Sequence, residues 1–110
     1  MRFILSLLML AVAAYASASA AWAQEPLTIT IRNHRFEPTE LKVPAGKRVT
    51  IYIVNEDPTP EEFESHSLKV EKVIPGKSKG LVRIGPLTKG RYEFFGEFHE
   101  KTAKGAVIVE

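Results

Sequence analysis

The stretch that decides the fold runs from Tyr92 to His99 and reads Tyr-Glu-Phe-Phe-Gly-Glu-Phe-His. It is followed at residues 104–109 by Lys-Gly-Ala-Val-Ile-Val. Short runs of aromatic and β-branched residues of this kind are typical of strands. The two runs therefore predict strands over 91–95 and 105–109, joined by a loop that carries a histidine among carboxylates.

The rest of the chain repeats this pattern of short apolar runs separated by Pro and Gly. Alternation with a period of two predicts further strands over 27–31, 41–43, 49–54, 66–70 and 79–84. In the fourth of these, His66, Leu68 and Val70 are expected to share a face. Seven short strands without a helical window predict a single all-β domain, a two-sheet β-sandwich with Greek-key connections.

The first 23 residues are predicted to be a signal peptide. Arg2 supplies a positive start, residues 3–14 are almost continuously apolar, and Ala21-Trp22-Ala23 is a small-x-small cleavage site. An uncleaved N-terminal anchor is the alternative. We expect export to the periplasm, with residues 24–110 as the folded domain.

Charge and cysteine content exclude several classes of function. The chain has 15 basic and 13 acidic residues, and Arg2 lies in the predicted signal peptide, so the remainder is almost neutral. This balance gives no reason to expect nucleic acid as a partner. The absence of cysteine removes disulfides, thiolate nucleophiles and thiolate metal ligands.

An acidic connection is expected between the strands at 49–54 and 66–70. Residues 55–65 contain five acidic side chains. This connection is longer and more charged than the usual link between two strands. A solvated acidic loop is one interpretation. Phe63 argues against a wholly solvated loop, because an aromatic ring there is expected to attach it to the body of the domain.

Several segments in the right order resemble the cupredoxin family. They are residues 36–46, residues 49–55 ending in Asn, His66 at the start of a strand, the aromatic run at 92–96, and His99 three residues later. The resemblance implies that Gly96 stands at the position of the copper-binding cysteine and Lys104 at that of the axial methionine. A blue-copper site requires the thiolate, so plastocyanin-type electron transfer is not expected.

A closer resemblance is to a bacterial, cysteine-lacking subgroup of small cupredoxin-like proteins. It depends on Glu-Glu-Phe-Glu-Ser-His at 61–66 and Phe-Gly-Glu-Phe-His at 95–99. The resemblance implies a periplasmic role in iron or copper acquisition, often beside a membrane iron permease.

Two imidazoles with nearby carboxylates predict a metal site without a thiolate. Imidazole suits Cu(II), Zn(II), Ni(II) and iron, and carboxylates add affinity for harder ions. The predicted ligands are His66, His99, Glu97, Glu64 and His34, with Glu62 as a further candidate. Both methionines lie in the predicted signal peptide, which favours one oxidised ion, copper(II) or iron.

The leading hypothesis is a periplasmic metal-binding protein auxiliary to iron or copper uptake or homeostasis, with a membrane transport component as its partner. The alternative is a metal-free interaction module that docks a membrane transporter or oxidase subunit. No enzymatic activity is expected, because no nucleophile–base pattern or phosphate loop is evident. The sequence leaves the oligomeric state open.

Overall fold

The computed structural model describes residues 26–110, and the predicted signal peptide lies outside these described residues. The strands are β1 (Leu27–Arg32), β2 (Arg35–Glu37), β3 (Glu40–Val43), β4 (Val49–Asn55), β5 (Glu61–Ser65), β6 (Val70–Ile74), β7 (Ser78–Ile84), β8 (Gly90–Gly96) and β9 (Lys104–Val109). A single 3-10 turn, η2 (Glu97–His99), follows β8 within this range. Among residues 26–110, no helix has the length and apolar character that crossing a bilayer requires.

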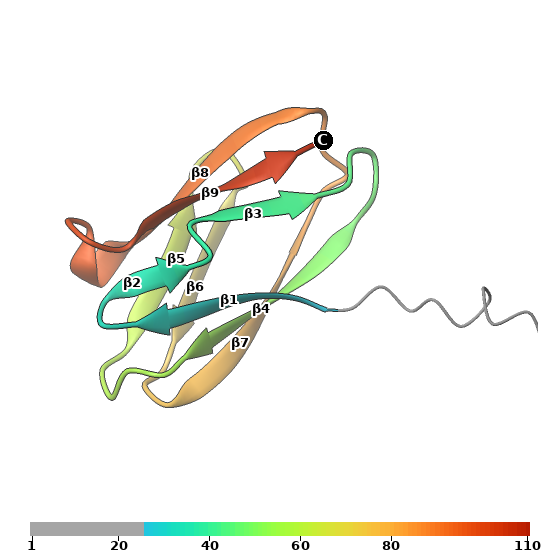
Figure 1. The fold of residues 1–110 in the computed structure, drawn as a ribbon. Helices are drawn as coiled ribbons and strands as arrows, with labels where there is room; N and C mark the ends of the chain where they lie inside the picture. The colour runs from blue at the N-terminus through green and yellow to red at the C-terminus, as the bar shows by residue number, and fades with distance from the viewer. Residues whose placement is uncertain (1–25) are drawn as a thin grey trace, which may run out of the picture.

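The strands form two facing sheets, which confirms the predicted Greek-key sandwich (Figure 1). One sheet has the order β2-β1-β4-β7 and the other β3-β9-β8-β5-β6. β1 pairs in parallel with β4, and β3 in parallel with β9, whereas the other pairs are antiparallel. The chain thus crosses repeatedly between the sheets, so loops that are distant in sequence meet at the ends of the sandwich.

The core lies between the sheets because alternate residues of each strand face inward. β4 shows the pattern clearly, since every second residue from Val49 to Asn55 is buried. Three phenylalanine rings, Phe36, Phe63 and Phe94, come from β2, β5 and β8 and pack with centroids 4.9–5.8 Å apart. Their contact joins the two sheets at the end where the β1–β2 turn lies.

The predicted strands other than the one at 66–70 are present, with ends that differ by at most one residue. The strand predicted over 66–70 is wrong, because residues 66–69 form a turn and β6 begins at Val70. The predicted acidic loop is also shorter than expected, since its second half is β5. Phe63 is fully buried in β5, so the expectation that this ring attaches the segment to the domain is confirmed.

Candidate metal centre

Four side chains with carboxylate or imidazole groups meet at one end of the sandwich. His34 lies in the turn between β1 and β2, and Asp57 lies in the connection from β4 to β5. Glu61 begins β5, and His99 ends η2. Figure 1 shows η2 and the β1–β2 turn at the same end of the molecule.

The first pair in this group is Glu61 and His99. Glu61 is 1% exposed, yet its carboxylate has three hydrogen-bond partners. Oε1 accepts the backbone N–H of Phe98 at 2.9 Å and of Glu62 at 3.0 Å. Oε2 lies 2.5 Å from Nδ1 of His99. These partners satisfy a buried charge that would otherwise be costly, and they fix the plane of the carboxylate.

The second pair is Asp57 and His34. The Asp57 carboxylate accepts the backbone N–H of Asn33 at 2.8 Å and of His34 at 2.9 Å, and Oδ2 lies 3.6 Å from Nδ1 of His34. Burial acts to raise the pKa of Asp57, but the two backbone hydrogen bonds outweigh it, and the nearby imidazoles of His34 and His99 lower it further. The pKa of Asp57 is therefore below its usual value, and the group is a carboxylate at neutral pH.

The β1–β2 turn needs this carboxylate because its backbone is unusual. Asn33 and His34 have φ values of +53° and +56°, as in a two-residue type I′ hairpin turn. Few residues other than glycine adopt this conformation, although Asn and His do so more often than most. Asp57 holds the two N–H groups of the turn, and the Thr102 hydroxyl donates to the His34 carbonyl at 2.6 Å.

The two imidazole rings stack on each other. Their centroids are 3.6 Å apart and their planes differ by 18°. The His99 side chain is 27% exposed and that of His34 is 43% exposed. Each ring has Nδ1 beside a carboxylate, so Nε2 is the nitrogen left for another partner on both rings.

The five predicted metal ligands are divided between two regions. His34 and His99 come together, as described. His66 does not join them, and the expectation that His66 and His99 converge is corrected here. β5 starts beside His99 at Glu61, and His66 lies five residues further on, about 16 Å away at the rise of an extended strand.

Glu64 lies on the outer face of β5, and Glu97 of η2 and His66 of the turn after β5 lie near it. Three carboxylates from β5 and β6, Glu62, Glu64 and Glu71, have oxygen atoms within 4.8 Å of one another. Burial raises the pKa of Glu64, and the adjacent carboxyls of Glu97 and Glu71 raise it further, while His66 lowers it. Burial also raises the pKa of Glu62, with Glu71 as the next cause. Exposed acidic groups of this kind are common without a metal ion.

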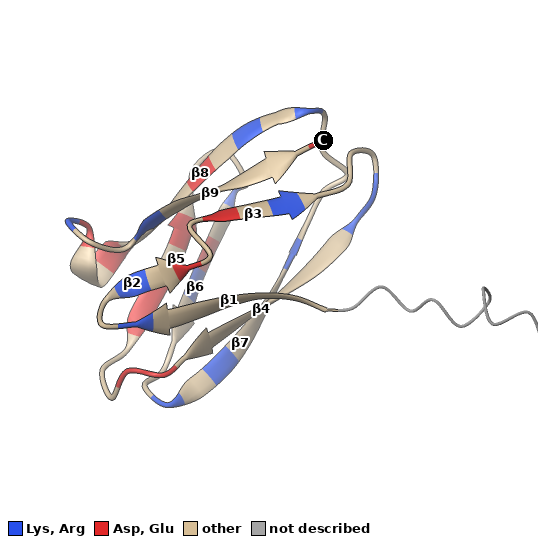
Figure 2. Ribbon diagram, viewed as in Figure 1, with Lys and Arg blue, Asp and Glu red and all other residues tan. Residues whose placement is uncertain are grey.

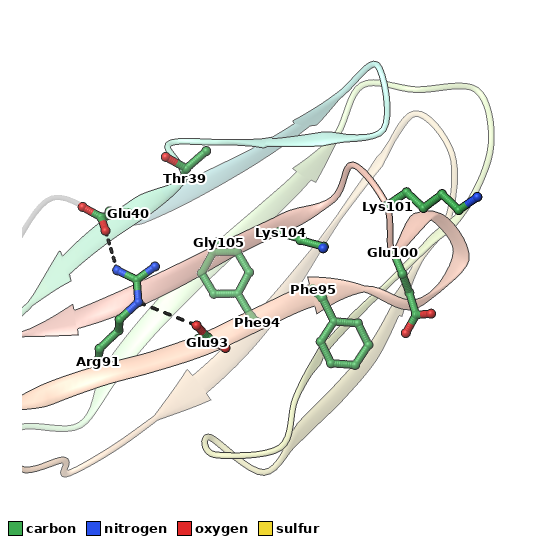
Figure 3. Close-up of a pocket in the computed structure, with 10 residues that line it drawn as sticks. All are labelled: Thr39, Glu40, Arg91, Glu93, Phe94, Phe95, Glu100, Lys101, Lys104 and Gly105. Atoms are coloured by element: carbon green, nitrogen blue, oxygen red, sulfur yellow. Dashed lines mark hydrogen bonds and ion pairs between the residues drawn. The ribbon is translucent and has the colours of Figure 1, made fainter.

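Charge is unevenly distributed over the two sheets. Figure 2 shows acidic residues on β5 and around η2, and basic residues along β7. An open groove crosses the outer face of β8 and β9 (Figure 3). In it, Arg91 forms ion pairs with both Glu40 and Glu93, so its charge is already neutralised by the groove itself.

Two site residues, Glu61 and Asp57, were missed in the sequence. The signal for Glu61 was alternation in β5, since Glu61, Phe63 and Ser65 share the buried face. An inward Phe63 therefore implies an inward Glu61 two residues earlier. No comparable signal existed for Asp57, because its partners are backbone groups of a turn 23 and 24 residues away.

Comparison with known proteins identifies the family. Residues 3–109 match the cupredoxin-like domain family. The chain belongs to this family. The resemblance to cupredoxins seen in the sequence is thereby confirmed, and the absence of cysteine is consistent with a cysteine-lacking subgroup.

A relative of known sequence is the uncharacterized protein RP394 of Rickettsia prowazekii (strain Madrid E). The two are 45% identical over 82 residues, which covers 74% of this chain and 65% of the relative. The match thus spans slightly less than two thirds of the length of that relative.

Solved cupredoxin-like structures share the fold at low sequence identity. The metal binding domain of the Cu(I) exporting P-type ATPase CopA of Streptococcus pneumoniae D39, solved with Cu(I), has a TM-score of 0.68 at 20% identity, covering 77% of this chain and 84% of that domain. A purple cupredoxin of Nitrosopumilus maritimus has a TM-score of 0.59 at 21% identity, covering 76% and 99%. These likenesses show the fold.

The donor groups of this cupredoxin fit a metal bound through imidazole and carboxylate, and they do not fit a blue-copper centre. The whole chain contains no cysteine, and its two methionines are at positions 1 and 9. Gly96 occupies the end of β8, where the resemblance places the copper-binding cysteine. Two neutral imidazoles with carboxylates behind them are a donor set that suits Cu(II) and iron.

Proposed function

We propose that this cupredoxin binds one metal ion, copper(II) or iron, at the end of the sandwich where His34 and His99 meet. The observation that supports the proposal most strongly is the pairing of each Nδ1 with a carboxylate. Metal-binding histidines commonly donate one ring N–H to a carboxylate and bind through the other nitrogen. His99 presents this arrangement, and His34, which stacks on it, has Nδ1 facing the Asp57 carboxylate at 3.6 Å.

The stacked rings also indicate which ligand moves on binding. In nearly parallel rings whose centroids are 3.6 Å apart, the in-plane lone pairs lie in two separate planes, so they do not converge on one ion. His99 is held by a short contact with a buried carboxylate. His34 is more exposed, and its ring nitrogen is 3.6 Å from Asp57, beyond an ordinary hydrogen bond. We therefore expect His34 to turn toward an ion bound at His99.

The remaining donors favour an oxidised ion. No thiolate is present in the chain, and no methionine lies among residues 26–110 to supply a thioether for Cu(I). Imidazole with oxygen donors suits Cu(II) and Fe(III). We expect a type 2 copper spectrum for the Cu(II) form, without an intense band near 600 nm.

The biological part of the proposal is a periplasmic binding protein auxiliary to iron or copper uptake or homeostasis. Two observations support it: the signal-like first 23 residues, and the likeness in fold to the metal binding domain of a copper-exporting ATPase. The expected partner is a membrane transport component. Binding without catalysis is the proposed activity.

Calorimetric titration of the purified protein with Cu(II), followed by EPR, tests the site. We expect one equivalent bound at neutral pH, and at least tenfold weaker binding in His34→Ala and His99→Ala. His66→Ala is the matched control, because it removes an exposed imidazole from another region. Undiminished affinity for Cu(II) in His99→Ala contradicts this site. A loss of affinity that is confined to His66→Ala would place the metal site on the outer face of β5 and β6 instead.

The alternative function is a metal-free module that docks a membrane transporter or oxidase subunit. The observation in its favour is Phe98, which is 48% exposed at η2 beside the imidazole pair. Exposed aromatic residues are common at the centres of protein interfaces. Absence of Cu(II) and iron binding by calorimetry, with partner cross-linking lost in Phe98→Ser, would favour this alternative.

A further inference from the structure

Gly96 lies where the site has no room for a side chain. A Cβ atom built on Gly96 would lie 2.6 Å from Cδ of Glu61, 2.8 Å from its Oε2 and 2.7 Å from Cβ of Ala103. Such separations essentially never occur for real Cβ atoms. The space beside the backbone of residue 96 is therefore already filled, chiefly by the Glu61 carboxyl group.

The Glu61 carboxylate is held there from three directions. Phe98 and Glu62 donate backbone N–H groups to Oε1, and His99 Nδ1 lies against Oε2. Because Glu61 is on the inward face of β5, its side chain points under η2 toward the end of β8. Phe98 N–H and His99 belong to η2, so one carboxylate fixes both the backbone and the ring of this turn.

We infer that Glu61 is the positioning residue of the site: it takes the side-chain space of residue 96 and holds His99 with Nδ1 protonated, so that only Nε2 can bind a metal. A carboxylate accepts hydrogen bonds and cannot donate them, so the facing ring nitrogen carries the proton. The tautomer follows from these contacts with Glu61 ionised, and its consequence for metal binding depends on the proposed function.

Gly96 and Glu61 therefore act as a unit. A side chain at 96 displaces the carboxylate, and loss of the carboxylate frees the ring of His99. For the same reason, Gly96→Cys alone does not rebuild a thiolate centre, because its Cβ meets Glu61 and Ala103 before the sulfur can be placed.

Nitrogen-15 NMR of the metal-free protein at pH 8 tests the tautomer directly. We expect His99 in the Nδ1–H form in the parent protein. Glu61→Gln should invert it, because the Gln oxygen is needed by the N–H groups of Phe98 and Glu62, so its NH₂ faces Nδ1 and requires a lone pair there. Glu62→Gln, on the outer face of the strand, should leave His99 unchanged.

Two results would overturn this assignment. One is an Nε2–H tautomer in the parent protein, which would mean that Glu61 is protonated and donates to Nδ1. The other is an unchanged tautomer in folded Glu61→Gln. The parent measurement needs no variant, so it decides the matter even where Glu61→Gln fails to fold.

Metal affinity is then measured in the same variants with Cu(II). Loss of a carboxylate behind a metal-binding histidine typically weakens binding about 10- to 100-fold, and we expect a loss of this size in Glu61→Gln with one equivalent retained at saturation. A parent protein that binds no Cu(II) contradicts the proposed function but leaves the tautomer result standing. Equal affinities in parent and Glu61→Gln overturn the positioning role.

A double-mutant cycle tests the coupling of residues 61 and 96. Gly96→Ala should shift the His99 tautomer populations in the parent background, because its methyl group displaces the carboxylate. In the Glu61→Ala background the same substitution should have a much smaller effect on His99, because only the contact with Ala103 remains. Equal effects of Gly96→Ala in both backgrounds would show that the two residues act independently.

Discussion

At the scale of single residues, two polar side chains organise the connection from β4 to β5. Asn55 is buried at the end of β4, where its amide donates to the carbonyls of Thr59 and Ile74 and its oxygen accepts the N–H of Asp57. This hydrogen bond helps to direct the Asp57 side chain toward the β1–β2 turn. The position of His34 thus depends on a carboxylate that the sequence shows only as one acidic residue among several.

Asp57→Asn is expected to lower the free energy of unfolding by about 2 kcal/mol, since hydrogen bonds to charged groups contribute about 1.5–3 kcal/mol. An amide oxygen can accept one of the two N–H groups of the turn, but the amide NH₂ then faces the other. Urea denaturation at pH 7 measures the loss. Glu56→Gln is the control, because its exposed ion pair with Arg32 contributes little. Equal stabilities of the two variants would contradict this role of Asp57.

At the scale of elements, β5 separates two kinds of carboxylate by strand alternation. Glu61 faces inward and is satisfied by η2, whereas Glu62 and Glu64 face outward toward Glu71 of β6. The outward carboxyls have raised pKa values, because burial and like charges disfavour their ionised forms. The same strand therefore carries one carboxylate that holds the site and two that repel their neighbours.

The outward carboxyls predict a pH dependence of stability. A glutamate whose pKa is raised in the folded protein binds its proton more tightly than in the unfolded chain. The contribution of this group to the free energy of unfolding is complete below its ordinary pKa, near 4.5. It is lost as the pH rises through the raised pKa of the folded protein. Glu62→Gln/Glu64→Gln is therefore expected to be more stable than the parent at pH 7, with the difference narrowing toward pH 4.

Urea denaturation at both pH values measures this difference. Glu93→Gln is the control, because Glu93 is an exposed carboxylate on β8 that pairs with Arg91. A double variant that is no more stable than the parent at pH 7 would show that Glu62 and Glu64 do not repel their neighbours in the folded protein.

At the scale of the whole molecule, the sandwich has neither a disulfide nor a thiol to stabilise it. Its stability depends on a core between two sheets, with three phenylalanine rings at the end that carries the site. The end of the sandwich with η2 and the β1–β2 turn is built from loops, and each loop is fixed by hydrogen bonds from another loop. Folding of this cysteine-free chain therefore involves no disulfide bond.

Export is the prediction that belongs to this scale. We expect the protein from the periplasmic fraction to begin at Gln24, and Ala23→Asp to retain residues 1–23, because signal cleavage requires a small residue before the cut. Mass spectrometry of the N-terminus measures both. Trp22→Leu is the control, since the middle position of the small-x-small site tolerates large residues. Parent protein that retains Met1 in the cytoplasm would contradict export.

The sequence by itself determined the class of fold, the positions of six strands and the family. Period-two alternation is a local property, so β1, β3, β4, β7, β8 and β9 could be read from it. The pair Gly96 and His99 was visible for the same reason, since both belong to one short segment. The sequence did not determine whether 61–65 or 66–70 forms the strand, because side chains of different polarity alternate in both segments. The charged residues at 61–65 also make that segment resemble a loop.

Only the tertiary structure decided which side chains form the site. Glu61 can be buried because η2, 37 residues later in the chain, supplies N–H and imidazole partners. His34 is placed by Asp57 and stacks on His99, 65 positions away. His66 is excluded from this site because an extended strand carries it away from η2. These outcomes depend on contacts between distant loops, which local patterns of residues do not encode.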